Sequence, residues 1–406
     1  MLAAALKSYL GGPATRPSSR PVNRSRLRKF LVPEVVFGVG TLGEVGSAVR
    51  RLGGTRPFVI SDAGVMAAGW VEAALPSFEE AGLNCQVWHG ITPNPKDHEV
   101  AAGFECYLES GCDVVVAIGG GSCIDAAKAV AILSGNGGNI LEYSGIERVS
   151  RPVPPLVAMP STAGTGADVS QFCVITDTIR KRKATIASRG VMPNISVTDP
   201  RLLTTMSTEL TVYTGFDALS HAIEAYVSKG GNFLSDLHAL AAVEAVRDHL
   251  LNSIERPDDL MAREGMAQAS LQAGLAFSNA FLGATHAISH QVGGALDLSH
   301  GLLNAMLLPY VMSFNAETRP ERYVEIAEVL GVAAPGMRPA EAAAAAIDWV
   351  RSFADKLSIP RRLGSLGVTV EDIDRFARNA LDDAYILTNP RTVTVGDVKR
   401  ICLAVL

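Results

Sequence analysis

The feature that most constrains the fold of this chain is a change of periodicity near residue 205. From residue 35 to residue 199, short β-rich runs alternate with helical stretches. Such alternation predicts a mostly parallel, doubly wound α/β sheet. After Pro200 the β signal vanishes, and Ala-rich helical periodicity continues to the C-terminus. We therefore predict an α/β domain over residues 34–205 and an all-α domain over residues 206–406, behind an N-terminal arm of residues 1–33.

The individual elements can be read from the same pattern. The expected strands or strand ends are VVFGVG, RPFVISDAG, NCQVWHG, CDVVVAIGGG, PPLVAMPST, QFCVITD, KATIAS and NISVTDP. The expected helices between them are Gly43 to Leu52, Val65 to Glu80, His98 to Ser110 and Ile124 to Ser134. The run QFCVITDTIRKRKATIAS is expected to be a hairpin whose turn carries Arg180, Lys181, Arg182 and Lys183.

Composition excludes several classes of function. The chain has 406 residues, of which 48% are hydrophobic and 19% charged, which is ample for a folded core. A net charge of −5 argues against nucleic acid as the main partner. No apolar run in the sequence reaches membrane-spanning length. The six cysteines form no CxxC motif, as expected for scattered reduced thiols in a cytoplasmic protein.

The N-terminal arm is the compositional exception. Residues 1–33 hold seven basic residues and no acidic residue, and most of the basic ones are crowded among Ser, Pro and Gly. An organellar transit peptide has this character, and so does a disordered arm that docks on a partner subunit. Both interpretations stay open, with targeting the less favoured.

Two glycine-rich loops compete as the site for a dinucleotide. GVGTLG, Gly38 to Gly43, matches G-x-G-x-x-G, and Asp62 follows at the end of the next expected strand. IGGGSCIDAAK, Ile118 to Lys128, follows a strong strand and opens a helix, so backbone N–H groups and the helix N-terminus can approach a pyrophosphate. A tight strand-to-helix turn is the favoured interpretation of GVGTLG. Asp62 is expected either to accept hydrogen bonds from an adenosine ribose, favouring NAD over NADP, or to cap the following helix.

Acidic and imidazole side chains at helical spacing predict a metal site. Asp217 and His221 stand four residues apart in TGFDALSHAIEAY, which places both on one helix face. THAISHQVGGALDLSHG adds His286, His290 and His300. One such pair alone is more often packed than ligating, but two clusters among small apolar residues favour a metal, because buried imidazoles and carboxylates are unfavourable unless paired. Three neutral imidazoles and one carboxylate leave a divalent ion with net positive charge and Lewis acidity.

Four longer motifs carry a family resemblance. GGGSCIDAAKAVA, PSTAGTGADVS, TGFDALSHAIEAY and THAISHQVGG…SHGLLNAMLLP together resemble the iron-containing (group III) alcohol dehydrogenases, in order, over roughly residues 30–406. The chain departs from the common pattern at Ala167 and Asp168, where the family has Ser-Glu, and at Gln291 and Ser299, where it has proline. These departures bear on how a substrate fits. None of them replaces a predicted metal ligand.

The resemblance implies an active-site cleft between the two domains and assigns residues to it. It makes GGGS, rather than GVGTLG, the pyrophosphate loop, and it places His290 near the nicotinamide as the catalytic candidate. The implied metal ligands are Asp217, His221, His286 and His300. The implied cofactor-binding residues are Asp62, Asn94, Gly119, Gly120, Gly121, Ser122, Asp125, Thr162, Thr165 and Lys183. Glu224, one turn past His221, is a candidate hydrogen-bond partner for a ligand imidazole, with a surface carboxylate as the alternative.

The expected activity is a metal-dependent hydride transfer between NAD and a small primary alcohol or diol, with its aldehyde. His290 is expected to relay the alcohol proton. Iron is the metal that the family implies, and zinc also suits the ligand set. The alternatives are a glycerol dehydrogenase-like or hydroxyacid-oxidising relative, or a non-catalytic regulatory NAD-binding protein. A homodimer or larger homo-oligomer is expected, partly from the β-edge at Val35 to Phe37.

Overall fold

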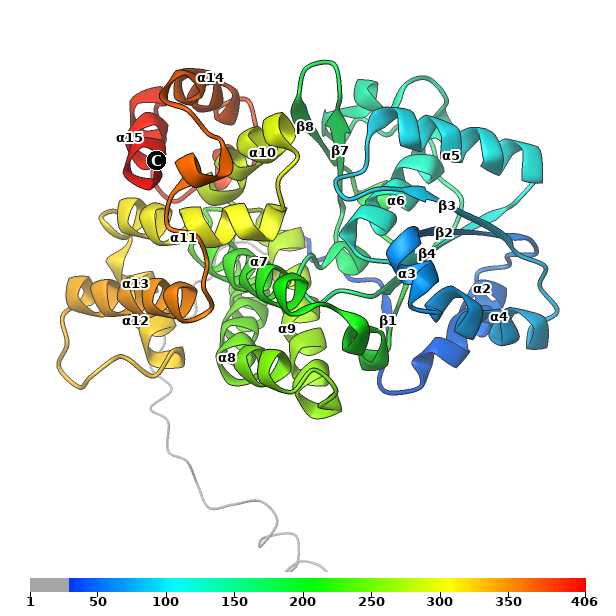
Figure 1. Cartoon of the computed structure of the whole chain (residues 1–406), viewed down its shortest axis with the longest axis horizontal. Helices are drawn as coiled ribbons and strands as arrows, with labels where there is room; N and C mark the ends of the chain where they lie inside the picture. Colours follow the sequence, from blue (N-terminus) through cyan, green and yellow to red (C-terminus); the bar gives the residue numbers. More distant parts are fainter. Residues whose placement is uncertain (1–28) are drawn as a thin grey trace, which may run out of the picture.

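The computed structural model describes residues 29–406, shown in Figure 1. The predicted basic arm and its targeting interpretation lie outside the described residues, except for residues 29–33. This short segment lies on the helical part of the chain. The Phe30 ring stacks on His238 at a centroid distance of 5.5 Å. Both backbone groups of Leu31 hydrogen-bond the Asn279 side chain, at 2.7 and 2.9 Å.

The α/β part is built on a six-stranded sheet with the strand order β1-β9-β6-β4-β2-β3. Its strands are β1 (Glu34–Phe37), β2 (Pro57–Asp62), β3 (Gln86–Ile91), β4 (Val114–Gly119), β6 (Leu156–Pro160) and β9 (Ile195–Thr198). Every pairing in this sheet is parallel. Parallel neighbours require crossover connections; α-helices lie in most of them, whereas the connection from β6 to β9 contains a hairpin of residues 172–187 and no α-helix. The predicted doubly wound sheet is confirmed.

Alternating side chains of the central strands bury both faces of this sheet. Val116 of β4 points into the core shared with α2 (Val45–Arg51) and α4 (Trp70–Glu80). Its neighbour Ala117 points into the opposite core, shared with α5 (Asp97–Ser110) and α6 (Gly121–Asn136). This alternation follows from the two-residue period of a strand.

The helix predicted over Val65 to Glu80 is wrong in one respect, because it is two helices. α3 (Ala63–Ala67) ends before Gly69, whose φ of 79° is the left-handed conformation that favours glycine, and α4 begins at Trp70. The break leaves Asp62 as the N-cap of the short helix α3.

A second, three-stranded sheet in the order β5-β8-β7 lies beside the first. It consists of β5 (Gly145–Ile146), β7 (Phe172–Asp177) and β8 (Arg182–Ala187). β7 and β8 form the predicted antiparallel hairpin. The predicted turn was too long: Arg182 and Lys183 already belong to β8, where Lys183 pairs with Thr176, and the left-handed residue of the turn is Lys181, with φ 50°.

Within the described residues, every regular element after Thr198 is helical. The α-helices are α7 (Thr208–Val227), α8 (Phe233–Glu255), α9 (Leu260–Ala280), α10 (Ala284–Leu296), α11 (His300–Ala316), α12 (Pro320–Val329), α13 (Pro339–Lys356), α14 (Val370–Ala380) and α15 (Val395–Val405). The 3-10 turns of the chain are η1 (Thr41–Glu44), η2 (Ile140–Tyr143), η3 (Ala167–Val169), η4 (Arg189–Val191), η5 (Pro200–Thr205), η6 (Leu363–Leu366) and η7 (Ala384–Thr388). The domain division at residue 205 stays a prediction.

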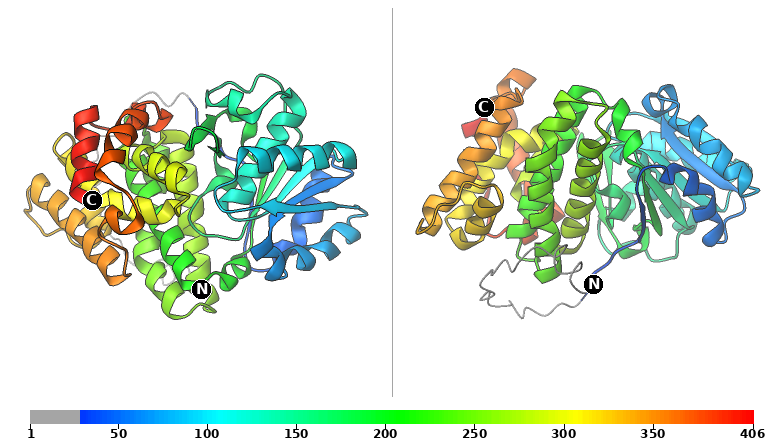
Figure 2. Two further views of the ribbon diagram at one scale, coloured as in Figure 1. Left: turned by 45° about the horizontal axis from the view of Figure 1, so that its top comes forward. Right: turned by 90° about the horizontal axis from the view of Figure 1, so that it is seen from below.

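The helical part lies beside the sheet, with α7 at its centre (Figures 1 and 2). α7 packs against α8, α9 and α11, and its residues from Phe216 to Val227 are all buried. A helix buried on all sides is held rigidly by its neighbours. In the part of the chain that the structure describes, no helix combines the length and apolar character needed to cross a membrane.

Candidate active site

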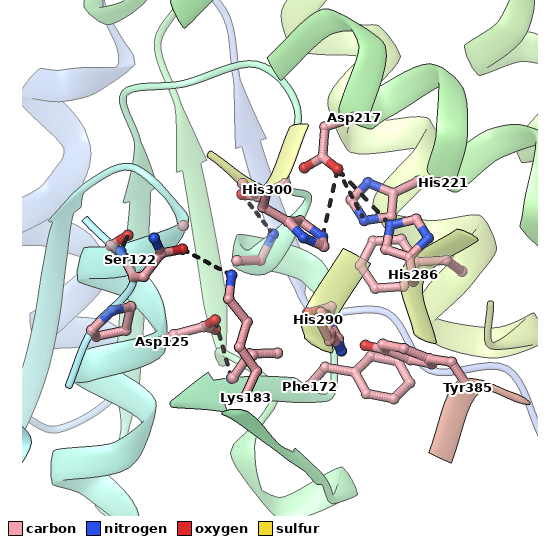
Figure 3. Close-up of a pocket in the computed structure, with 18 of the residues that line it drawn as sticks. Ser122, Asp125, Phe172, Lys183, Asp217, His221, His286, His290, His300 and Tyr385 are labelled. Atoms are coloured by element: carbon pink, nitrogen blue, oxygen red, sulfur yellow. Dashed lines mark hydrogen bonds and ion pairs between the residues drawn. The ribbon is translucent and has the colours of Figure 1, made fainter. Parts of the chain in front are cut away.

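The four predicted metal ligands converge from three helices of the helical part. α7 contributes Asp217 and His221, α10 contributes His286, and His300 is the first residue of α11. One ligand atom from each lies within 4.8 Å of the ligand atoms of the other three. In Figure 3 dashed lines join the Asp217 carboxylate to all three imidazoles, which lie on one side of it. Its Oδ1 lies 3.9 Å from Nε2 of His221, 3.9 Å from Nε2 of His286 and 3.8 Å from Nε2 of His300.

These separations fit a shared divalent ion. Ligands at tetrahedral angles, with bonds of about 2.0–2.2 Å, are about 3.3–3.6 Å apart. The observed set is slightly wider, so a small inward movement of the side chains would complete the coordination. Burial lowers the pKa of His221 to about 4, and burial together with the nearby Lys183 charge holds the pKa of His300 well below its usual value. Both imidazoles are therefore neutral near pH 7, as metal ligands must be.

Hydrogen bonds orient the ligand imidazoles toward the shared centre. Nδ1 of His221 lies 3.1 Å from the Gly164 carbonyl oxygen, so it carries the proton and leaves Nε2 as the ligand atom. Nδ1 of His286 lies 2.7 Å from Glu224 Oε2, so it also carries the proton and leaves Nε2 as the ligand atom. Nδ1 of His300 lies a longer 3.4 Å from the Ser289 hydroxyl. The structure thus places Glu224 where the sequence suggested, inside the core against a ligand.

Glu224 has a second function at the start of α10. Its carboxylate accepts hydrogen bonds from the backbone N–H groups of Gly283, at 3.0 Å, and Thr285, at 2.7 Å. Burial acts to raise the pKa of Glu224, but the hydrogen bond and charge of His286 and these backbone donors outweigh it and lower the pKa. An ionised carboxylate at a helix N-terminus is favourable, so one residue both caps α10 and orients its ligand.

The GGGS loop joins β4 to α6 at the carboxyl edge of the large sheet. Gly119 ends the strand, Gly120 precedes the helix, and Gly121 and Ser122 begin it. A Cβ on Gly121 would lie 2.7 Å from Cγ2 of Thr165, so no side chain fits between the loop and its neighbour. Nearby, the buried Oγ1 of Thr162 has no hydrogen-bond partner among the described residues. A bare backbone at a helix N-terminus beside an unpaired hydroxyl fits a bound pyrophosphate.

The structure confirms one of the two interpretations of Asp62, the helix cap, and the ribose contact stays a prediction. Oδ1 of Asp62 accepts a 2.9 Å hydrogen bond from the Val65 N–H, so it caps α3. Its Oδ2 accepts a 3.1 Å hydrogen bond from the Cys123 thiol. The residue also lines the larger of two cavities at the sheet edge, where a carboxylate can meet a ribose.

Asn94 and Lys183 form a polar bridge between the GGGS loop and the hairpin. The Lys183 ammonium donates a 2.8 Å hydrogen bond to Asn94 Oδ1, and the Asn94 backbone N–H donates to the Ser122 hydroxyl at 3.1 Å. Burial lowers the pKa of Lys183 to about 8, against the opposing effect of Asp217 and other carboxylates. Figure 3 shows Lys183 reaching into the pocket from β8.

Asp125 lies deeper, between α6 and the hairpin. Its Oδ2 accepts a 3.1 Å hydrogen bond from the Val174 N–H, and burial raises its pKa to about 6. One turn further along α6, the fully buried Lys128 donates to the carbonyl oxygens of Ser170, at 3.0 Å, and Phe172, at 2.6 Å. Asp125 and Lys128 therefore attach the pocket-side end of the hairpin to α6.

Two adjoining cavities, of about 120 and 740 Å³, bring the two sets of residues together. The larger one runs along the sheet edge and the smaller one reaches the imidazoles. Residues shared by both linings are Asn94, Gly121, Ser122, Thr165, Asp217 and His300. Of the predicted cofactor residues, only Gly119 lies outside both linings. GVGTLG also lies outside them, as a tight turn in which Asp199 Oδ2 accepts hydrogen bonds from Gly40 and Leu42.

His290 lies beside the ligands and outside their set. Its ring is 5.1 Å from that of His300, and its Nδ1 lies 2.8 Å from Oδ2 of Asp383. Burial lowers the pKa of His290 despite Asp383, so the imidazole is neutral, with its proton on Nδ1 and its Nε2 unprotonated. This environment therefore favours the neutral imidazole of His290 over the imidazolium.

Two polar residues of the site were missed from sequence. Asp383 precedes η7, far along the chain from His290, and no local spacing connects them. Asn304 lies one turn after His300 on α11, and its amide nitrogen is 2.8 Å from Oδ1 of Asp217. The i, i+4 spacing from a predicted ligand was the available signal for Asn304. The aromatic wall of the smaller cavity, formed by Phe172, Phe277 and Tyr385, was also not foreseen.

Comparison with known proteins agrees with this geometry. Residues 33–200 match the family described as iron-containing alcohol dehydrogenase, and residues 211–406 match the C-terminal part of the Fe-containing alcohol dehydrogenase family. The chain is 39% identical to the NAD-dependent methanol dehydrogenase of Bacillus methanolicus, covering 92% of this chain and 98% of that one. It is 40% identical to the 1,3-propanediol dehydrogenase of Citrobacter freundii, and the match covers 90% of this chain and 95% of that one.

Solved structures show the same fold. The crystal structure of a 1,3-propanediol oxidoreductase is similar with a TM-score of 0.90 and 37% identity, covering 93% of this chain and 99% of that one. The alcohol dehydrogenase from Oenococcus oeni is similar with a TM-score of 0.90 and 34% identity, and the match covers 93% of this chain and 100% of that one. The chain therefore belongs to the iron-containing alcohol dehydrogenase family, and the sequence prediction of a metal-containing alcohol oxidoreductase is confirmed.

Proposed function

We propose that this protein transfers a hydride between NAD and a short primary alcohol or diol, interconverting it with the aldehyde. The observation that carries the proposal is the continuity of the two cavities. Residues of the GGGS loop and two of the metal-ligand residues line the same space, so a nicotinamide can lie against an alcohol held at the metal. Relatives named for methanol and for 1,3-propanediol support a small substrate.

We assign the divalent ion to Asp217, His221, His286 and His300. Iron is the metal we expect from the family, and zinc is the alternative that this ligand set also suits. A bound ion supplies a Lewis acid that favours the ionised form of an alcohol. The protein's own contribution is to keep the imidazoles neutral and oriented through the Gly164 carbonyl and the Glu224 carboxylate.

The cofactor assignments follow the larger cavity. Gly120, Gly121 and Ser122 line it and would present backbone N–H groups to the pyrophosphate, while Gly119, at the end of β4 and outside the lining, is assigned from the family resemblance alone. Thr162 and Thr165 flank that loop and offer hydroxyl groups to it. Asp62 accepts hydrogen bonds from the adenosine ribose and repels a 2′-phosphate, which favours NAD. Asn94, Asp125 and Lys183 line the inner end, where the nicotinamide half would lie.

His290 is the proposed acceptor of the alcohol proton. Because its Nδ1 proton is donated to Asp383, Nε2 has a free lone pair. Protonation of Nε2 creates an imidazolium that the Asp383 carboxylate stabilises. Asp383 is then a positioning residue for His290.

The substrate assignment rests on the small volume of the inner cavity. About 120 Å³ is enclosed by Phe172, Phe277 and Tyr385 together with the imidazoles. The rings of Phe172 and Tyr385 lie 5.1 Å apart, so they narrow the space beside the ligands. Short unbranched alcohols suit this space better than bulky ones.

A substrate panel tests the proposal. Alcohols, diols, glycerol and hydroxyacids, with the matching aldehydes, are assayed with NAD(H) and NADP(H) on protein whose metal has been identified by elemental analysis. We expect turnover of short primary alcohols with NAD, loss after chelation and recovery with one metal. Absence of turnover across the panel in metal-loaded protein would contradict the proposal and favour a regulatory NAD-binding role.

We further propose a cytoplasmic homodimer or larger homo-oligomer. The support for assembly is β1, an edge strand that, among the described residues, pairs in the large sheet with β9 alone. An edge strand presents unpaired backbone groups to another chain. Size-exclusion chromatography with light scattering tests this, and a monomer at working concentration would contradict it.

A further inference from the structure

A short clasp of polar contacts joins the two parts of the chain beside the larger cavity. On the α/β side it consists of Asn94 and Lys96, in the loop between β3 and α5, and on the helical side of Asp297, in the loop between α10 and α11. The Asn94 amide nitrogen donates to Asp297 Oδ1 at 2.8 Å, and the Lys96 ammonium lies 3.3 Å from Asp297 Oδ2. Both carboxylate oxygens of Asp297 therefore take part in the clasp.

The two residues that hydrogen-bond across the clasp both have a left-handed backbone conformation. The φ angle is 56° at Asn94 and 52° at Asp297. Residues other than glycine rarely adopt this conformation, although Asn and Asp tolerate it better than most. Such conformations persist where the surrounding contacts hold them, and they concentrate at ligand clamps and switch segments. Two of them bonded to each other beside a ligand cavity indicate a functional segment.

The clasp lies where the two cavities adjoin. Asn94 lines both of them, and Asp297 lines the larger one together with Gly120, Gly121 and Ser122. The Asp297 side chain is 59% exposed, so the clasp forms an outer edge of this space. A dinucleotide whose nicotinamide reaches the ligand imidazoles would therefore lie behind the clasp.

The two sides of the clasp differ in how firmly they are held. On the α/β side, the Lys96 ammonium also donates to the Pro93 carbonyl oxygen at 2.5 Å. The Pro95 carbonyl oxygen accepts a 2.8 Å hydrogen bond from the Thr176 N–H of β7. Among the described residues, residues 297–299 bond to the α/β part only through the clasp. The loop between α10 and α11 is therefore the side that can move.

We propose that the clasp is a gate for the dinucleotide. The loop between α10 and α11 releases Asn94 and Lys96 before the nicotinamide half enters or leaves. Because Asp297 bonds to protein donors rather than to the ligand, the closed gate slows association and dissociation alike and leaves the affinity nearly unchanged. The inference rests on the proposed function, and it makes Asp297 a residue that controls how fast the cofactor exchanges.

Stopped-flow fluorescence of NADH binding to the metal-loaded protein tests the gate without relying on turnover. Asp297→Gly removes the carboxylate, and glycine suits the left-handed backbone at this position, so the fold should be retained. The association and dissociation rate constants should both rise about 10-fold, with Kd changed by less than about threefold. Asp297→Asn keeps an acceptor for Asn94 and loses the ion pair with Lys96, so both rate constants should rise only about two- to threefold.

Ser358→Gly is the matched control. Ser358 is also an exposed, left-handed residue just after a helix, with φ 58°, and it lies outside both cavity linings. Its replacement should leave both rate constants unchanged. Equal acceleration in this variant would overturn the inference, because any loosened loop would then have the same effect.

Two results with Asp297→Gly would also overturn it. One is a pair of rate constants equal to those of wild type. The other is faster dissociation with unchanged association, because Kd would then rise in proportion and Asp297 would stabilise the bound ligand without gating its entry. A folded, metal-loaded wild type that binds no NADH would instead remove the proposed function, and the gate with it.

Discussion

The two halves of the site are built in opposite ways. In the α/β half, the proposed cofactor residues lie mainly where strands end, on loops and helix starts such as Gly119 to Ser122. In the helical half, Asp217 and His221 lie in the middle of a helix whose neighbours bury it on all sides. An extended ligand is bound by many weak contacts along an edge, whereas a single ion needs a few side chains in fixed positions. We therefore expect substitutions in the helical half to abolish function and those in the α/β half to adjust it.

The largest effect is expected for His286→Ala. Removing one imidazole leaves three ligands and takes the imidazole partner from the buried Glu224 carboxylate, so metal content should fall well below one per chain and turnover by at least about 100-fold. Elemental analysis and steady-state kinetics measure this. His238→Ala is the control, because His238 lies on α8 against Phe30 and Gln272, away from the ligands. Full metal stoichiometry with normal turnover in the His286 variant would refute the assignment.

A smaller effect is expected for Asp62→Gly, which removes the charge facing the proposed ribose. The ratio of kcat/KM with NADP to that with NAD should rise about tenfold, which corresponds to about 1.4 kcal/mol. Glycine at a helix N-cap costs only a few tenths of a kcal/mol, so the protein should stay folded. Asp62→Asn removes the charge and retains the hydrogen bond to Val65. This variant therefore distinguishes the effect of the charge from the effect of the helix cap. An unchanged cofactor ratio in both variants would exclude the proposed role.

The smallest effect is expected from the titration of Lys183. Its pKa is lowered to about 8 by burial, so the side chain is charged below that pH and neutral above it. If its charge helps to bind the cofactor, KM for NAD should rise a few-fold above about pH 8 in wild type. In Lys183→Arg, whose guanidinium stays charged, the rise should be absent. A wild-type KM that stays constant from pH 7 to about pH 9.5 would show that this charge is not used.

The same contrast explains what the sequence could predict. The GGGS loop and the Asp217–His221 pair are local patterns, and both were found because strand ends and helix turns impose fixed spacings. The strand positions and the antiparallel hairpin were likewise predicted from short β-rich runs that alternate with helical stretches. These features require only residues that are close together in the chain.

The errors and omissions share a different cause. Lys183 was assigned to a turn because consecutive basic residues resemble a solvated loop, yet its side chain is buried and bonded to Asn94. The pairing of His290 with Asp383 spans 93 residues and depends on the packing of η7 against α10. The break at Gly69 was hidden by helix-forming residues on both sides. Tertiary contacts decide such positions, and no local pattern encodes them.

The short carbonyl contact between Gly164 and His221 links the two halves of the molecule. Gly164 lies between Thr162 and Thr165, which line the larger cavity, and a Cβ there would lie 2.2 Å from the Thr214 carbonyl oxygen. In the proposed complex, a dinucleotide that orders this loop would therefore also steady His221, one of the proposed metal ligands. By thermodynamic reciprocity, the factor by which NAD tightens metal binding must equal the factor by which metal tightens NAD binding. Loading with either one should therefore lower the dissociation constant of the other.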